Sequence, residues 1–173
     1  MKTKSILALA LTLALMLSLG VCAFADDAKY DVTKNFVEGL AELEGATATV
    51  QPDTVEIGGT AFEVVNIDYE GDLSEYISHF NIYFSEDCSQ VLLSMPIMNI
   101  DEAKQADVIT AVNNLNATST SVKLYVDTDK NTVVGELFLL ATKDSVLDIA
   151  ATGTGLFIKF TDWVYDSLKD FEA

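Results

Sequence analysis

The chain has 173 residues and a formal charge of −17 at pH 7, because 27 aspartate and glutamate residues outnumber 10 lysines. A surface this negative repels phosphate backbones and anionic lipid heads, so the composition excludes nucleic-acid binding. No linker, repeat or low-complexity segment interrupts the chain after the amino-terminal segment, and this predicts a single domain over residues 26–173.

Residues 1–25 have the pattern of a cleavable signal peptide. Two lysines precede an apolar run over residues 6–21, which is shorter than the roughly 20 residues that a transmembrane helix needs. Small residues flank Phe24, as at a signal peptidase site, so we expect cleavage between Ala25 and Asp26. The protein is then secreted or held in the cell envelope, with no membrane span after cleavage.

An alternative to simple secretion is a lipoprotein anchored through Cys22. The bulky Val21 stands where such a site needs a small residue, and this disfavours the anchor. Cleavage after Ala25 removes two lysines and no acid, and leaves 8 lysines against 27 acidic residues, a formal charge of −19. Only Cys88 then remains, so no disulfide can form within the chain.

The first part of the predicted domain contains a helix and several strands. Apolar residues recur at helical spacing over residues 30–43. After this segment the apolar residues recur at every second position, as in a β-strand. This pattern predicts a short hairpin over residues 46–57 and a further strand over residues 61–67.

A hairpin over residues 76–95 carries apolar side chains on both of its faces, and Pro96 is expected to end its second strand. Phe80, Ile82 and Phe84 share one face with Tyr76, whereas Ile77 and Tyr83 lie on the other. One face can rest on the domain's own helices. The other then needs the closing helix, a partner or a second copy to cover it.

The second half predicts a helix over residues 101–115, a hairpin over residues 121–140 and a closing helix after Asp144. Gly153 and Gly155 in the closing helix indicate a break or a close approach to the sheet. The fold class is therefore α+β: an antiparallel sheet of hairpins packed with three helices, in the order α-β(hairpins)-α-β-β-α. Two buried stripes are expected, comprising Ala103, Ala106, Ile109, Val112 and Leu115 in the second helix and Ile149, Leu156, Phe160, Trp163, Leu168 and Phe171 in the closing helix.

A family resemblance covers about residues 80–171. Its elements are the hairpin ending in Met95-Pro96, the helix ending Val112-Asn113-Asn114-Leu115-Asn116, the hairpin with Leu124-Tyr125-Val126-Asp127 and the aromatic-rich closing helix. This arrangement resembles the YbjN-like domain family, which is similar in fold to class I type III secretion chaperones. The resemblance implies a homodimer that pairs through the second helix and the adjoining sheet. The chain departs from the family by its export signal and its lack of arginine.

Residue types that carry chemistry are sparse. His79 is the only histidine, and it is separated along one hairpin from Cys88, so neither a Cys–His dyad nor a zinc site of ordinary composition is expected. The run Asp127-x-Asp129-x-Asn131 resembles the start of a calcium loop. Thr132 and Phe138, however, stand where such a loop needs glycine and glutamate, so we interpret the run as a polar hairpin turn. We therefore predict no catalytic, cofactor-binding or metal-binding residues.

Two functions are consistent with these patterns. The first is an exported, non-enzymatic, chaperone-like binding module that holds a peptide or protein partner and pairs as a homodimer. Its candidate interaction surface comprises Ile77, Tyr83, Ile109 and Val112. The alternative is a hydrolase that works through carboxylates or a metal, suggested only by the number of acidic residues.

The first prediction concerns processing. Intact-mass spectrometry of the protein isolated from its native host should give a chain that begins at Asp26, because the amino-terminal pattern places the cleavage site after Ala25. An acylated Cys22, or a chain that retains its apolar run, would contradict the assignment.

Overall fold

The computed structural model of the chain describes residues 27–41, 46–69, 76, 79–119 and 121–173. The predicted signal peptide lies outside these residues, with Cys22, Ala25 and Asp26, and so does Ile77. Within the described ranges, no helix is both long enough and apolar enough to cross a bilayer.

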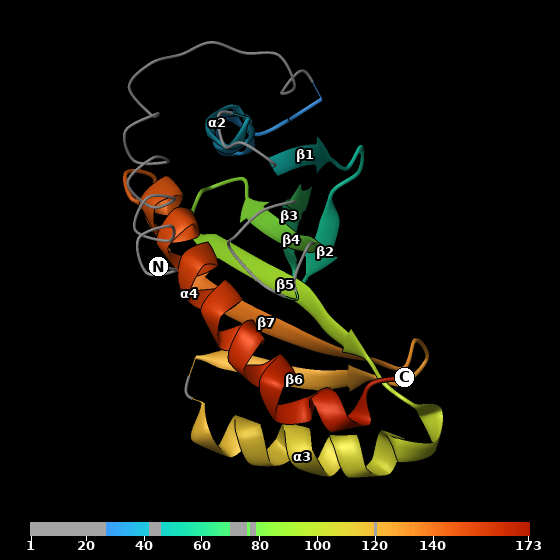
Figure 1. Cartoon of the computed structure of the whole chain (residues 1–173). Coiled ribbons are helices and arrows are strands. Elements are labelled where there is room, and N and C mark those ends of the chain that lie inside the picture. Colours follow the sequence, from blue (N-terminus) through green and yellow to red (C-terminus); the bar gives the residue numbers. More distant parts are fainter. Residues whose placement is uncertain (1–26, 42–45, 70–75, 77–78, 120) are drawn as a thin grey trace.

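The described residues form an α+β fold in which helices pack on an antiparallel sheet (Figure 1). The sheet has seven strands in the order β1-β3-β4-β5-β7-β6, and β2 pairs with β3 as well. In chain order the elements are α2 (Asp31–Leu40), β1 (Ala46–Val50), β2 (Val55–Ile57), β3 (Thr60–Tyr69), β4 (His79–Ser85), β5 (Gln90–Asn99), η1 (Glu102–Lys104), α3 (Gln105–Thr118), β6 (Val122–Asp127), β7 (Thr132–Leu140), α4 (Val146–Leu168) and η2 (Lys169–Phe171).

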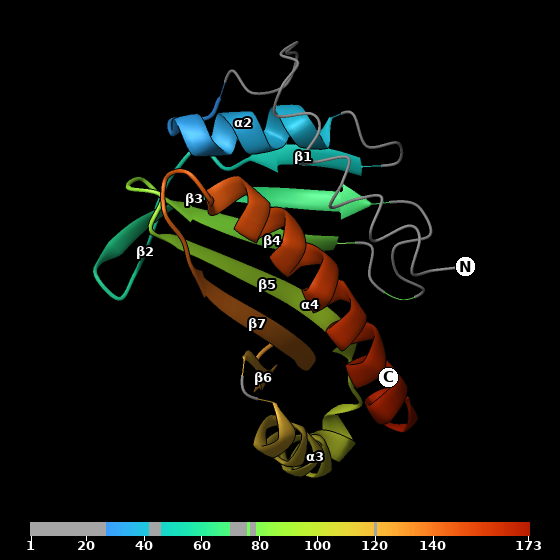
Figure 2. The ribbon, with the colours of Figure 1, turned by 90° about the vertical axis from the view of Figure 1, so that its left-hand side faces the viewer.

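Helices α2 and α4 lie on the same side of the sheet, and α3 lies beside β6 (Figure 2). The strand residues that point toward α2 and α4 form the main core. One row of this core runs straight across five strands and comprises Val65, Ile82, Leu93, Leu137 and Val122, all of them buried. Helix α4 adds Phe157 and Val164, which are also fully buried. The alternation of apolar residues within each strand accounts for this one-sided core.

Two glycines allow α4 to lie close to the sheet. A side chain at Gly153 of α4 would overlap Leu139 of β7. A side chain at Gly135 of β7 would lie 3.3 Å from both Phe157 and Ile97, a tight contact. Helix α4 runs without interruption through Gly153, so this glycine marks a close approach and not a break in the helix.

Two strand predictions are wrong in detail. Residues 46–57 do not form a hairpin with each other, because β1 and β2 both pair with β3. The amide of Gln51 still donates to the Val64 carbonyl at 2.9 Å, so the chain follows β3 past the end of β1. Strand β5 also continues beyond Pro96, which lies past the last residue that pairs with β4. A proline there removes no hydrogen bond to β4, and a register shift between Pro96 and Met98 accommodates it beside β7.

The buried stripes of two helices also differ from the prediction. In α4, Leu156 and Trp163 are exposed, whereas their sequence neighbours Phe157 and Val164 are buried. In α3 the buried residues are Val108 and Val112, and Ile109 is 38% exposed. One residue corresponds to about 100° around a helix, so a small error in the phase of the apolar pattern exchanges a buried residue for an exposed one.

A buried carboxylate joins the start of the domain to the sheet. Glu63 of β3 is fully buried, and its two oxygens accept hydrogen bonds from the backbone amides of Lys29 at 2.6 Å and Tyr30 at 2.9 Å. Tyr30 is the N-cap of α2 and makes no side-chain capping bond of its own. Glu63 therefore supplies, from a distant strand, the carboxylate that a glutamate in the first turn contributes to a capping box.

The second prediction follows from this anchor. Glu63→Ala should lower the free energy of unfolding by about 3 kcal/mol, because it removes two charge-assisted hydrogen bonds and leaves two amides without an acceptor. Urea denaturation measures the change. Glu56→Ala, at an exposed position of β2, is the control and should change stability by less than about 0.5 kcal/mol. Equal stability of the two variants would contradict the anchoring role.

Candidate functional site

The side of the sheet opposite α2 and α4 carries a second group of apolar side chains, which we call the open face. Its centre is a row in which Val64, Tyr83, Leu92 and Phe138 lie side by side on β3, β4, β5 and β7. These residues alternate with the core residues of the same strands, so their side chains point to the side of the sheet opposite α2 and α4. The complete apolar set is Val55, Ile57, Phe62, Val64, Tyr83, Leu92, Tyr125, Val134, Phe138 and Leu140.

Exposed apolar area is concentrated on the open face. Nine large hydrophobic side chains of the described residues are exposed, and five of them belong to this face. These five are Val55, Ile57, Tyr125, Phe138 and Leu140, with exposed fractions from 39% to 74%. Phe62, Val64 and Leu92 are buried between them. Exposed apolar side chains that gather on one face of a sheet are typical of interaction sites on soluble proteins.

A polar row adjoins the apolar one. Asn66, Asn81, Ser94, Glu136 and Lys123 lie side by side across five strands. The Nε2 atom of Gln51 donates to Asn66 Oδ1 at 3.1 Å, which holds one end of the row. Asn81 Oδ1 is buried and has no hydrogen-bond partner among the described residues. Apolar contact and hydrogen bonding are thus both available to a ligand on one face.

Two tyrosines connect these rows. The Tyr125 hydroxyl donates to Glu136 Oε1 at 3.2 Å. Burial, and then the charge of Glu136, raises the pKa of Tyr125 to about 12. Burial also raises the pKa of Tyr83, against the effect of a hydrogen bond from Asn81. Both hydroxyls therefore stay protonated near neutral pH and can donate hydrogen bonds.

The four residues expected on an interaction surface do not lie together. Tyr83 lies half-buried on the open face. Ile109 is exposed on α3, at the other end of the sheet, and Val112 is only 2% exposed and belongs to the core. Ile77 lies outside the described residues. Phe138, Leu140 and Tyr125 were missed, although the unbroken apolar run over residues 137–140 indicates a strand with apolar residues on both faces.

The side chains with catalytic potential are placed apart. His79 Nδ1 lies 2.7 Å from Asp68 Oδ1, on an exposed part of the sheet. Cys88 is in the β4–β5 turn, and burial raises the pKa of its thiol, with a further contribution from Asp87. No three histidine, cysteine or acidic side chains of the described ranges gather closely enough to hold a metal ion.

In the acidic β6–β7 turn, the first carboxylate, that of Asp127, accepts hydrogen bonds from the backbone of the turn itself. Asp127 Oδ1 accepts hydrogen bonds from the amides of Asp129 and Lys130, both at 3.2 Å. Hydrogen bonding from the Lys130 side chain, with these amide bonds, lowers the pKa of Asp127. This is the geometry of a hairpin turn closed by an aspartate.

No known protein-family model matches this chain, and no curated protein matches it significantly. The resemblance to YbjN-like domains therefore stays a prediction.

The third prediction concerns the contact between Tyr125 and Glu136. The pKa of Tyr125 is about 12 in the folded chain and about 10 in the unfolded chain. The stability that the protonated phenol contributes is therefore fully present below pH 10 and is lost as the pH rises from about 10 to about 12. Glu136→Gln should lower the pKa of Tyr125, because it removes the negative charge beside the phenol. The ring-carbon NMR shifts of Tyr125 against pH give this value. Asp127→Asn, which removes a weaker charge effect, should lower it less, and an unchanged value in Glu136→Gln would show that the two groups are not in contact.

Proposed function

We propose that this protein is an exported, non-enzymatic binding module, chaperone-like in action, that holds a peptide or protein partner on its open face. One observation carries the proposal: five of the nine exposed large hydrophobic side chains of the described residues lie on the one sheet face that α2 and α4 leave uncovered. In solution such an area is stabilised when a partner removes it from water.

The chemistry of the face favours a partner with both apolar and polar groups. Phe138 and Leu140 offer apolar contact, and Tyr125 adds an aromatic ring with a hydroxyl. The neighbouring polar row presents amide, hydroxyl and carboxylate groups in fixed register. A chain charge of −17 favours a neutral or basic partner over an acidic one.

A homodimer is a second way to cover the open face. The charge on each chain opposes self-association, so a dimer must gain enough from apolar burial to overcome a repulsion that salt weakens. Sedimentation equilibrium at low and physiological salt distinguishes the two arrangements. A dimer that strengthens with salt indicates pairing through the open face, and a monomer at both salts leaves a heterologous partner.

The fourth prediction tests the open face directly. Phe138→Asp places a charge at its centre and should abolish capture of partners from the envelope fraction of the producing cell, since a charge is costly to bury in an apolar contact. Quantitative mass spectrometry of the captured proteins is the measurement. Because 52% of Phe138 is exposed, the substitution should cost no more than about 2 kcal/mol of stability, chiefly through lost strand propensity and partial burial, and should leave the protein folded.

Leu156→Asp is the matched control, because Leu156 is an exposed apolar residue on the outer side of α4. It should capture the same partners as the unaltered protein. If both substitutions leave the captured set unchanged, the open face is not the binding surface. If Leu156→Asp alone loses the partners, the surface lies on α4.

A further inference from the structure

The two edge strands of the sheet, β6 and β1, differ in whether their outward backbone groups have hydrogen-bond partners. At the β6 edge, the side chain of Asn116 in α3 bonds the backbone of Leu124 twice: its Nδ2 donates to the Leu124 carbonyl at 2.8 Å, and its Oδ1 accepts from the Leu124 amide at 2.8 Å. The amide group of Asn116 thus takes the place that a peptide group of a neighbouring strand would occupy. This edge is closed to further pairing at its centre.

The β1 edge has no such protection within the described part of the chain. β1 is the terminal strand of the sheet order and pairs only with β3. Its sequence, Ala46 to Val50, contains no charged residue and no proline, the residues that commonly protect edge strands. It is therefore an uncharged edge that consists mostly of small residues.

The direction of the free hydrogen-bonding groups of β1 follows from its register. The Gln51 amide donates to Val64, so the backbone groups of Thr49 and Thr47 also point toward β3. Those of Ala46, Ala48 and Val50 point the other way, away from the sheet. They offer three donors and three acceptors at the spacing of a strand.

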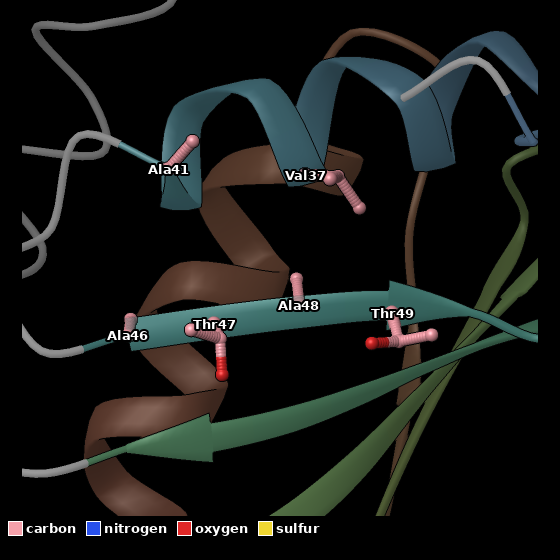
Figure 3. Close-up of a pocket in the computed structure, with 6 residues that line it drawn as sticks. All are labelled: Val37, Ala41, Ala46, Thr47, Ala48 and Thr49. Carbon is pink, nitrogen blue, oxygen red and sulfur yellow. The ribbon is translucent and has the colours of Figure 1, made fainter. Parts of the chain in front are cut away.

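A groove accompanies this edge. A cavity of about 290 Å³ lies between α2 and β1 and is lined by Val37, Ala41, Ala46, Thr47, Ala48 and Thr49 (Figure 3). Figure 3 shows Ala46 and Ala48 pointing toward α2, and Thr47 and Thr49 pointing away from it. In Figure 1, α2 lies to the side of β1 on which α4 also lies. Strand side chains stand perpendicular to the sheet, whereas the backbone hydrogen-bonding groups lie in its plane, so α2 covers the face of β1 and not the edge position at which one more strand would pair (Figure 3).

We propose that β1 binds an extended, basic peptide segment of a partner as an additional strand at this edge, alongside α2. Backbone hydrogen bonds to Ala46, Ala48 and Val50 supply the pairing, as in other strand-addition complexes. The alanine walls of the groove select small side chains at the alternate positions that face α2. The chain charge of −17, with Asp68 across from Thr47, selects lysine or arginine at the ends of the segment.

A second copy of this chain fits the edge less well. One five-residue strand buries far less than the roughly 800 Å² per partner of a stable interface, and both copies carry the same negative charge. The site is separate from the open face and does not depend on the function proposed for it.

Fluorescence anisotropy with the mature protein and a defined peptide tests this proposal. The probe is a short fluorescein-labelled peptide of alternating alanine and threonine with lysines at both ends. Two analogues carry N-methyl groups on every second amide, in opposite phases. Only alternate amides of an added strand point at β1. One analogue should therefore bind at least about tenfold more weakly than the probe, and the other within about twofold.

Substitutions in the chain test the same contact from the other side. Ala48→Pro removes an outward amide and should weaken binding at least about tenfold. Ala48→Leu keeps that amide but fills the groove, and it should weaken binding even if the proline variant folds poorly. Thr47→Val, which points away from α2, and Phe138→Asp on the open face should bind the probe like the unaltered protein.

The proposal is overturned if the probe shows no saturable binding up to about 1 mM, if the two methylation phases have equal effects, or if neither substitution at Ala48 weakens binding. A dimer that Ala48→Pro dissociates would make a second copy the occupant and overturn it as well. Loss of partner capture in Phe138→Asp with normal probe binding separates this edge site from the open face.

Discussion

The arrangement of helices on the sheet depends on how closely α4 packs against it. Gly153 on the helix and Gly135 on β7 leave out the side chains that would hold the two layers apart, and Phe157 occupies the space beside Gly135. This contact commits α4 to the side of the sheet that α2 already covers. The other side then has no helix among the described residues to cover it, although its strands carry apolar residues there too. The open face is thus a consequence of where the longest helix packs.

The sequence predicted the elements better than their partners. Alternation over residues 76–95 identified β4 and β5, and it placed Phe80 and Tyr83 on opposite faces, as the structure does. It did not show that β1 and β2 both pair with β3, because pairing depends on contacts between segments that are distant in the sequence. A local pattern reports which face a residue lies on, and it carries no information about the neighbouring strand.

The candidate site was predicted only in part. Apolar residues on both faces of one hairpin indicated that some sheet surface would need a cover, and Tyr83 lies on that surface. Phe138 and Leu140 were missed, because an unbroken apolar run reads equally well as a strand buried on both sides. Val112 was predicted both in the buried stripe of its helix and on the interaction surface, and only the first prediction agrees with its burial. Which apolar residue stays in water is decided by packing between elements, and the helix period alone does not reveal it.

The double hydrogen bond of Asn116 to Leu124 also has a consequence for aggregation. Growth of a cross-β fibril needs two competent edges on every unit, one to join the growing end and one to receive the next unit. The β6 edge is occupied by the side chain of Asn116 from α3. The sheet can therefore pair with a strand at β1, but it cannot pair with a further copy at β6. Pairing of whole copies of the chain through β1 therefore stops at two copies. An uncharged edge of alternating alanine and threonine, which would otherwise promote fibril growth, can in this way remain accessible in a soluble protein.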